Sequence, residues 1–189
     1  AQAAEDLGFE YIEVPDHVFG ATARDGWVPR YDAHAPFHET FTTMAFIAAC
    51  TSRIKISSGV LILPQRQTGV VAKQAAEVDI LSGGRLRLGI GVGWLREEFD
   101  ALGIPWERRG ARTDDYVAAM RALWAGDSAS HDGEFVSFSG VSSNPKPVNG
   151  SVPIVIGGHS DAAARRAGRL GNGFWPAKGD LDHLLDVMR

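Results

Sequence analysis

The chain has 189 residues, of which 44% are hydrophobic and 22% charged, with a formal net charge of −4. This composition is typical of a folded domain with one sizeable core and excludes a disordered segment. The small negative charge provides no field for nucleic acid or an anionic membrane, and no stretch approaches the roughly 20 apolar residues of a membrane span. The one cysteine, Cys50, cannot pair within the chain, and its apolar surroundings predict a buried thiol in a reducing compartment. We therefore expect a cytoplasmic protein.

Strand-like and helical patterns alternate along the chain. Residues 1–7 have the pattern of a helix that Gly8 ends, and residues 9–14 that of a strand that Pro15 ends. After a polar loop from Asp16 to about His38, the expected elements are a helix over 41–49, a strand over 54–61, a helix that ends at Ser82-Gly83-Gly84, a strand over 85–91, a helix over 113–124, a strand over 152–156, a helix over 161–170 and a short strand at Phe174-Trp175. This alternation indicates βαβ units, a parallel sheet and the α/β class.

Two parallel architectures fit these repeats of roughly 30 residues, a (β/α)8 barrel and an open doubly wound sheet. The segment from Gly133 to Gly150 is a loop elaboration of the kind that barrels carry. A barrel takes roughly 250 residues, and this chain opens in one helical pattern and closes, over residues 181–189, in another. Periodicity favours the barrel, so we expect residues 1–189 to form a single partial TIM-barrel domain, and the family resemblance given below implies that its first strand and its last strands are missing.

Four segments directly follow predicted strands, where ligands bind in parallel α/β folds. They are Asp16-His17, Gly59-Val60, Gly91-Val92-Gly93-Trp94 and Gly157-Gly158-His159-Ser160. A histidine at a strand end can donate a hydrogen bond or shuttle a proton near neutral pH. The alternative for the first segment is an aspartate that caps a turn beside a solvated histidine.

The two glycine segments predict different contacts with a ligand. Trp94 occupies the place of the third glycine in a dinucleotide-binding loop, so Gly91 and Gly93 either let a flat ring approach the backbone or form a tight turn. Gly157 and Gly158 precede a helix whose free N–H groups and dipole favour an anion, with Ser160 as its cap. A phosphate site is the functional interpretation here, and a capped helix after a glycine turn is the alternative.

Other polar groups are expected to be structural. His34 and His38 stand four apart, but Pro36 between them opposes a helical metal site, so we expect no metal. Asp79 is expected on a solvated helix face. Arg108, Arg109 and Arg112 are expected as a basic helix start on the surface, with contact to a cofactor tail as the alternative.

The order of these segments resembles the luciferase-like monooxygenase superfamily, and within it the branch of probable coenzyme F420-dependent oxidoreductases. The resemblance covers nearly the whole chain. It rests on Leu7-Gly8-Phe9, Val14-Pro15-Asp16-His17, Gly59-Val60-Leu61-Ile62-Leu63-Pro64, Ala72-Lys73-Gln74, Leu81-Ser82-Gly83-Gly84-Arg85, Gly91-Val92-Gly93-Trp94-Leu95-Arg96-Glu97-Glu98-Phe99, Pro145-Lys146-Pro147 and Val155-Ile156-Gly157-Gly158-His159.

The resemblance implies a barrel with a flavin-like ring across its strand ends. It implies that His17 is catalytic, that a non-proline cis peptide at Gly59-Val60 backs the ring, and that the glycine pair holds the phosphate. The cofactor-binding residues would then be Asp16, Gly59, Val60, Gly91, Gly93, Gly157, Gly158 and His159. The sugar-phosphate dehydrogenase of this group has a glutamate proton donor where this chain has Trp94, which implies an apolar substrate pocket formed by Trp94 and Ile62.

The leading hypothesis is therefore an oxidoreductase that transfers a hydride between the deazaflavin coenzyme F420 and a small organic substrate. The alternatives are an FMN-dependent monooxygenase that uses reduced flavin and O2, and a barrel that binds flavin without catalysis. We expect a homodimer, a separate enzyme that supplies reduced coenzyme, and neither nucleic acid nor membrane as a partner.

Overall fold

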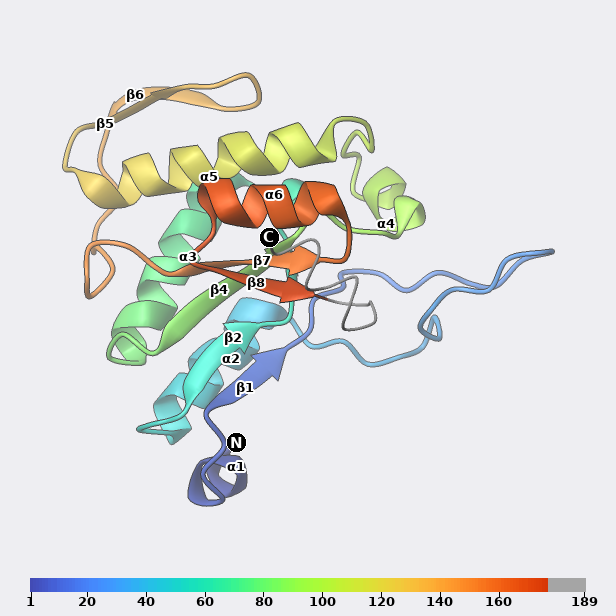
Figure 1. The fold of residues 1–189 in the computed structure, drawn as a ribbon, viewed down its shortest axis with the longest axis horizontal. Coiled ribbons are helices and arrows are strands. Elements are labelled where there is room, and N and C mark those ends of the chain that lie inside the picture. Colours follow the sequence, from blue (N-terminus) through green and yellow to red (C-terminus); the bar gives the residue numbers. More distant parts are fainter. Residues whose placement is uncertain (177–189) are drawn as a thin grey trace.

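A curved parallel sheet organises the molecule. The computed structural model describes residues 1–176, and within them the sheet has the order β1-β2-β4-β7-β8, with β3 beside β4 (Figure 1). All its pairings are parallel. The strands are β1 (Tyr11–Val14), β2 (Lys55–Ser58), β3 (Leu61–Ile62), β4 (Leu86–Gly91), β7 (Ile154–Gly158) and β8 (Gly173–Pro176).

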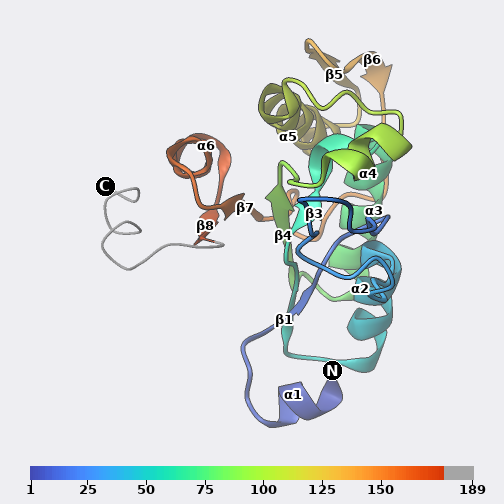
Figure 2. The ribbon, with the colours of Figure 1, turned by 90° about the vertical axis from the view of Figure 1, so that its right-hand side faces the viewer.

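The helices cover the convex side of this sheet. Viewed from the carboxyl ends of the strands, the sheet bends from β1 through β4 to β7 and β8, with the helices outside the bend (Figure 2). They are α2 (Thr40–Cys50), the 3-10 turn η1 (Leu63–Gln65), α3 (Thr68–Leu81), α4 (Arg96–Ala101), α5 (Arg109–Ala125) and α6 (Asp161–Leu170). The short helix α1 (Gln2–Asp6) precedes β1 and has no buried residue. The α/β class is thus confirmed as a parallel half-barrel, and closure into a full barrel stays a prediction.

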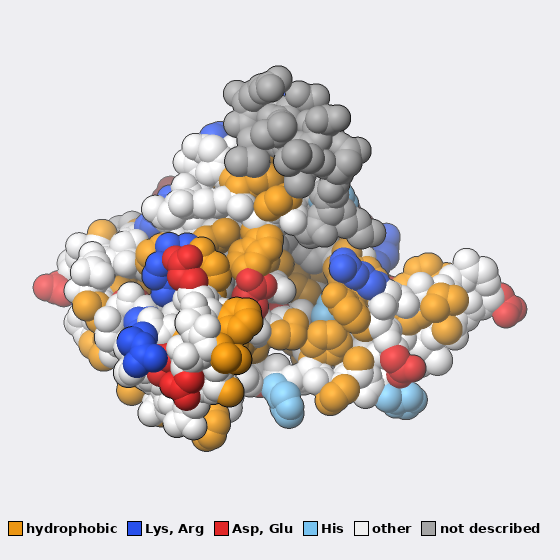
Figure 3. Space-filling model, turned by 60° about the horizontal axis from the view of Figure 1, so that its bottom comes forward, with side chains coloured by type: hydrophobic (Ala, Val, Ile, Leu, Met, Phe, Trp, Pro, Cys, Tyr) orange, Lys and Arg blue, Asp and Glu red, His pale blue; other side chains and the backbone are white. Residues whose placement is uncertain are grey.

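Alternation along the strands explains which face is covered. In β4, Leu86, Leu88 and Ile90 are buried against the helices, whereas Arg87 is half-buried on the other face. The same period places Tyr11, 40% exposed, on the concave side. That side is hollowed and carries apolar side chains interspersed with charged ones (Figure 3). None of the helices within residues 1–176 is long and apolar enough to cross a membrane.

Most expected elements lie where the patterns placed them, and the helix at 161–170 has the expected bounds. The strand expected over 54–61 is divided into β2 and β3, and the turn η1 and helix α4 were not expected. An antiparallel hairpin of β5 (Ala129–Asp132) with β6 (Ser137–Val141) was not expected either, and it lies in the segment interpreted as a loop. Asp115 of α5 ties this hairpin down, because its carboxylate accepts hydrogen bonds from Phe135 N at 2.6 Å and from His131 Nε2 at 2.6 Å. The helical pattern over 181–189 lies outside the described residues.

Outside the strand ends, the expectations for Asp79 and Cys50 were wrong. Asp79 is buried rather than solvated, since its carboxylate accepts a hydrogen bond from Val148 N at 2.9 Å, and burial raises the pKa of this carboxyl. Cys50 is half-buried at the end of α2, because the helix ends there and exposes its last turn.

Candidate cofactor and substrate site

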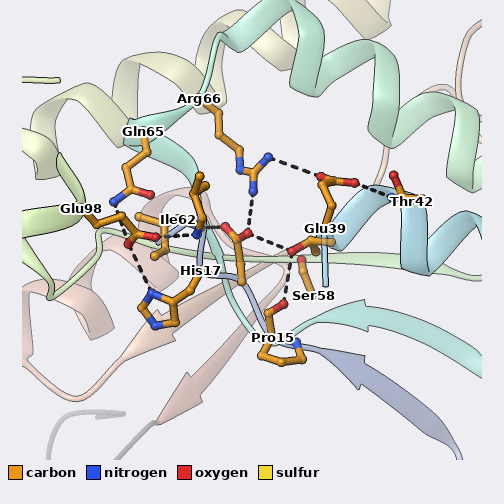
Figure 4. A network of polar contacts seen from close by, with 12 residues as sticks. Pro15, His17, Glu39, Thr42, Ser58, Ile62, Gln65, Arg66 and Glu98 are labelled. Atoms are coloured by element: carbon orange, nitrogen blue, oxygen red, sulfur yellow. Dashed lines mark hydrogen bonds and ion pairs between the residues drawn. The ribbon is translucent and has the colours of Figure 1, made fainter. Parts of the chain in front are cut away.

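His17 follows β1 and lies in contact with a buried carboxylate. Its Nδ1 is 3.2 Å from Oε2 of Glu98, the third residue of α4, and the His17 side chain is 8% exposed (Figure 4). The Glu98 side chain has no exposed surface. The site therefore holds a histidine–carboxylate pair that is shielded from solvent.

Three further donors surround the Glu98 carboxylate. Val18 N and Phe19 N donate to Oε1 at 2.5 and 3.1 Å, and Gln65 Nε2 donates to Oε2 at 3.1 Å. The pKa of the Glu98 carboxyl lies below its usual value. Burial by itself would raise this pKa, but the hydrogen bonds from these groups and from His17 have the larger combined effect. Glu98 is consequently an anion in the folded protein.

Asp16 is buried beside this pair, and its carboxylate is engaged by its own chain. It accepts hydrogen bonds from Thr40 Oγ1 at 2.9 Å and from Ile62 N at 2.8 Å, and it forms an ion pair with Arg66 at 2.5 Å. These contacts join the end of β1 to β3 and to the start of α2. That Asp16 also contacts a coenzyme stays a prediction.

Aromatic rings enclose His17 on its other sides. The ring centroids of Phe37, Tyr31 and Trp94 lie 4.9, 5.5 and 5.6 Å from that of His17, all in edge-to-face arrangements. Trp94 is 41% exposed, whereas Ile62 is only 3% exposed. Of the two residues predicted to line a substrate pocket, Trp94 thus presents surface next to His17, whereas Ile62 is buried.

The peptide bond between Gly59 and Val60 is cis, as the resemblance implied. The Val60 side chain fills the space between two of the predicted glycines. A Cβ added at Gly91 would lie 2.7 Å from Val60 Cγ2, and one at Gly157 would lie 2.6 Å from Val60 Cγ1. Glycine at these two positions therefore makes room for the valine.

Close packing also requires glycine at positions 93 and 158. Gly93 has a φ of +81°, and a Cβ there would lie 2.7 Å from the Phe99 ring. Gly158 has a φ of +150°, and its Cβ would meet the Cβ of Ala163 at 2.5 Å. The tight turn that was the alternative for Gly93 is present, and Gly158 allows α6 to begin close to β7.

A cavity of about 600 Å³ opens at the carboxyl ends of β4 and β7. Its lining includes the predicted residues Gly91, Gly157, Gly158 and His159 together with Ser160, whose side chain caps α6 by accepting a hydrogen bond from Ala163 N at 3.3 Å. The segment after β4 connects this cavity to His17, because Gly91 lines the cavity and Trp94 contacts the histidine ring. The cavity and the surroundings of His17 thus lie at opposite ends of residues 91–94, at the carboxyl ends of the strands.

Arg109 brings a positive charge to this cavity, contrary to the expected surface location. Its guanidinium stacks on the Trp106 ring, 3.6 Å from the centroid, and its Nε donates to Gly93 O at 3.4 Å. Burial lowers its pKa. Among residues 1–176 no carboxylate pairs with Arg109, whereas Arg108 pairs with Glu134 and Arg166 with Asp114. Arg112, also expected on the surface, is buried and donates to Pro105 O at 2.7 Å.

Sequence reasoning missed Glu98, Gln65 and the role of Arg109. The signal for Glu98 was a carboxylate pair, Glu97-Glu98, directly after a strand-end glycine segment, but the six-residue helix that carries it is too short for periodicity to reveal. Arg109 precedes a helix that was expected to begin only at 113. Within the described part of the chain, no group of three or more His, Cys, Asp or Glu residues could hold a metal ion.

The fold and the site together define a parallel half-barrel with a histidine and a cavity lined by arginine and glycine residues at the carboxyl ends of its strands. The family model described as luciferase-like monooxygenase matches residues 1–188. The chain belongs to the luciferase-like monooxygenase family.

Relatives of this chain include uncharacterized proteins and an enzyme that uses reduced FMN. An uncharacterized protein of Mycobacterium tuberculosis is 35% identical over 191 residues, 97% of this chain and 66% of the relative. The FMNH2-dependent dimethylsulfone monooxygenase of Pseudomonas putida is 32% identical over 168 residues, 87% of this chain and 43% of that enzyme. The chain therefore spans less than two thirds of the length of these relatives.

Solved structures show the same fold. A monooxygenase from Streptomyces bottropensis superposes with a TM-score of 0.83 at 27% identity, over 98% of this chain and 55% of that enzyme. An F420-dependent secondary alcohol dehydrogenase in complex with an F420–acetone adduct superposes with a TM-score of 0.77 over 92% of this chain and 51% of that one. Its identity of 24% supports a shared fold alone.

Proposed function

We propose that this chain forms the coenzyme-binding part of an oxidoreductase that transfers a hydride between coenzyme F420 and a small organic substrate. The observation that supports this most is the presence, at one edge of the sheet, of a cavity lined by Arg109, which pairs with no carboxylate among residues 1–176, and of a shielded histidine–carboxylate pair. The cavity would hold the anionic part of the coenzyme, and the histidine would act next to its ring.

The residues of the cavity fit a phosphate. Two helices begin at it, α5 at Arg109 and α6 at Asp161, so free N–H groups and the positive ends of two helix dipoles converge there. The planar guanidinium of Arg109 is suited to bidentate contact with phosphate oxygens. In this proposal Gly157, Gly158 and His159 form the wall of the phosphate site.

The remaining site residues have distinct tasks. Val60, held between Gly91 and Gly157, would form the surface behind the ring, with Gly59 and Gly93 shaping its edges. His17 would hydrogen-bond the substrate oxygen, and Trp94 would provide an apolar wall for the substrate. Asp16 would keep the end of β1 in place. Bound F420 would supply the hydride chemistry at its C5, while the protein supplies orientation and electrostatics.

An FMN-dependent monooxygenase is the second candidate. It is favoured by the identity of 32% with the dimethylsulfone monooxygenase of Pseudomonas putida. The same cavity would take the phosphate of FMN, so the two proposals differ in the ring and in the chemistry that follows.

Titration of the protein with oxidised F420 and, separately, with oxidised FMN tests the proposal. We expect F420 to bind tightly with a change in its absorbance, and to be reduced when a substrate is present. Tight binding of FMN alone would favour the monooxygenase, and weak binding of both would refute either function. Turnover that is unchanged in His17→Ala would refute the catalytic role of His17.

Arg109→Gln tests the anion cavity itself. Hydrogen bonds to charged groups contribute about 1.5–3 kcal/mol, so we expect the coenzyme Kd to rise roughly 10- to 100-fold. The matched control is Arg165→Gln on the outer side of α6, where the side chain is 76% exposed. A Kd in Arg109→Gln that stays within threefold of that of the control would show that the anion lies elsewhere.

A further inference from the structure

Glu98 joins three parts of the structure through one buried carboxylate. Oε2 contacts the histidine ring after β1 and the Gln65 amide of η1, and Oε1 accepts hydrogen bonds from Val18 N and Phe19 N. The last two residues begin the loop that carries Tyr31 and Phe37 to the other sides of the His17 ring. Among the described residues, Glu98 is the carboxylate that touches this ring.

The contacts of Glu98 determine which nitrogen of His17 carries a proton. An ionised carboxylate only accepts hydrogen bonds, so Nδ1 of His17, at 3.2 Å, has to donate. In the neutral ring the other nitrogen, Nε2, then has a lone pair. Figure 4 shows the second ring nitrogen of His17 directed away from Glu98. The other charged groups near the ring do not compete for it, because Asp16 is engaged by Arg66 and Thr40.

We propose that Glu98 is the positioning residue for His17, which holds the proton on Nδ1 and so presents Nε2 as the atom that exchanges a proton with substrate. This inference rests on the proposed function. In the oxidation of an alcohol, Nε2 would take the O–H proton while bound F420 would supply the acceptor for the C–H hydride, which leaves a carbonyl product and an imidazolium. Glu98 balances that imidazolium charge, and the reverse reaction returns the proton from Nε2.

Glu98→Gln separates this role from simple support of the loop. The amide oxygen of the new side chain still accepts from Val18 N and Phe19 N, so the loop keeps its anchor. Its NH2 group, however, faces Nδ1 with a donor and forces the proton of His17 onto Nε2. Gln65 Oε1 is buried and has no hydrogen-bond partner among the described residues. If the Gln65 amide turns over, this oxygen can accept a hydrogen bond from the new NH2 group at position 98.

Nitrogen-15 NMR of histidine-labelled protein without coenzyme reports the tautomer directly. The His17 signals are assigned by their loss in His17→Gln. We expect the Nδ1–H tautomer in the unmodified protein and the Nε2–H tautomer in Glu98→Gln. With coenzyme and substrate, kcat should fall about 10²- to 10⁴-fold, while KM and the coenzyme Kd stay within about threefold.

The matched control is Glu97→Gln, the same change at the preceding residue, whose carboxylate pairs with Arg24 at the surface. It should keep the Nδ1–H tautomer and kcat. An Nε2–H tautomer in the unmodified protein, or a folded Glu98→Gln variant whose kcat stays within threefold of the control, would overturn the proposal. The tautomer measurement needs no coenzyme, so failure of the proposed function would be seen separately, as absence of binding with the tautomers as expected.

Discussion

The Val60 side chain should make alanine at Gly91 or Gly157 unfavourable. An added Cβ at Gly91 would lie 2.7 Å from Cγ2 of Val60, and one at Gly157 would lie 2.6 Å from Cγ1. Neither glycine has a positive φ, so backbone strain does not contribute. The valine cannot turn away from one position without approaching the other, because its two methyl groups face the two glycines and its χ1 is restricted.

The change in the free energy of unfolding is the difference between the cost of overpacking and the gain from restricting the unfolded chain. Overpacking typically costs about 1–3 kcal/mol, and replacing glycine recovers about 0.4–1 kcal/mol through the unfolded chain. Gly91→Ala should therefore lower the free energy of unfolding by up to about 2 kcal/mol. In a Val60→Ala background the nearest remaining atom is Val60 Cβ at 3.7 Å, an ordinary contact, so the same substitution should be neutral or stabilising.

Urea unfolding of the protein without coenzyme, carried out as a double-mutant cycle, measures this change of sign. Gly168→Ala is the matched control, since Gly168 lies exposed in α6 with nothing within 4 Å of an added Cβ, and it should stabilise by about 0.5–1 kcal/mol. The reasoning is refuted if Gly91→Ala has the same effect in both backgrounds, because the coupling to Val60 would then be zero.

Two further predictions concern ion pairs and protonation. Asp16→Ala leaves Arg66 without its buried partner and should lower the free energy of unfolding by about 3–5 kcal/mol; a loss below 1 kcal/mol in urea unfolding would contradict the assigned pair. Hydrogen bonds from the backbone N–H groups of Ile54, Arg53 and Ser52 lower the pKa of Glu5 from 4.5 to about 2. The ionised Glu5 carboxylate therefore contributes to stability above pH 4.5, and this contribution is lost as the pH falls through 2. Between these pH values, the free energy of unfolding of Glu5→Gln, measured by urea unfolding, should fall less than that of the unmodified protein. Equal falls would contradict the lowered pKa of Glu5.

Local patterns in the chain were sufficient for much of the fold. The helix over 161–170 and the strand ends at Val14 and Gly91 follow from periodicity, glycine and capping residues, which act over a few neighbouring positions. The hairpin of β5 and β6 escaped because its exposed, polar strands show little of the alternation that marks a half-buried strand.

The composition of the site shows the same division. Local patterns place His17, Gly91, Gly157 and Trp94 at the ends of strands, and parallel strands bring their carboxyl ends to one edge. The packing of distant elements, by contrast, brings His17 to Glu98, 81 residues away, places Val60 between two glycines and turns Arg109 into the cavity. These contacts depend on how helices pack across the sheet, and side-chain contacts between distant elements leave no period in the sequence from which they could be predicted.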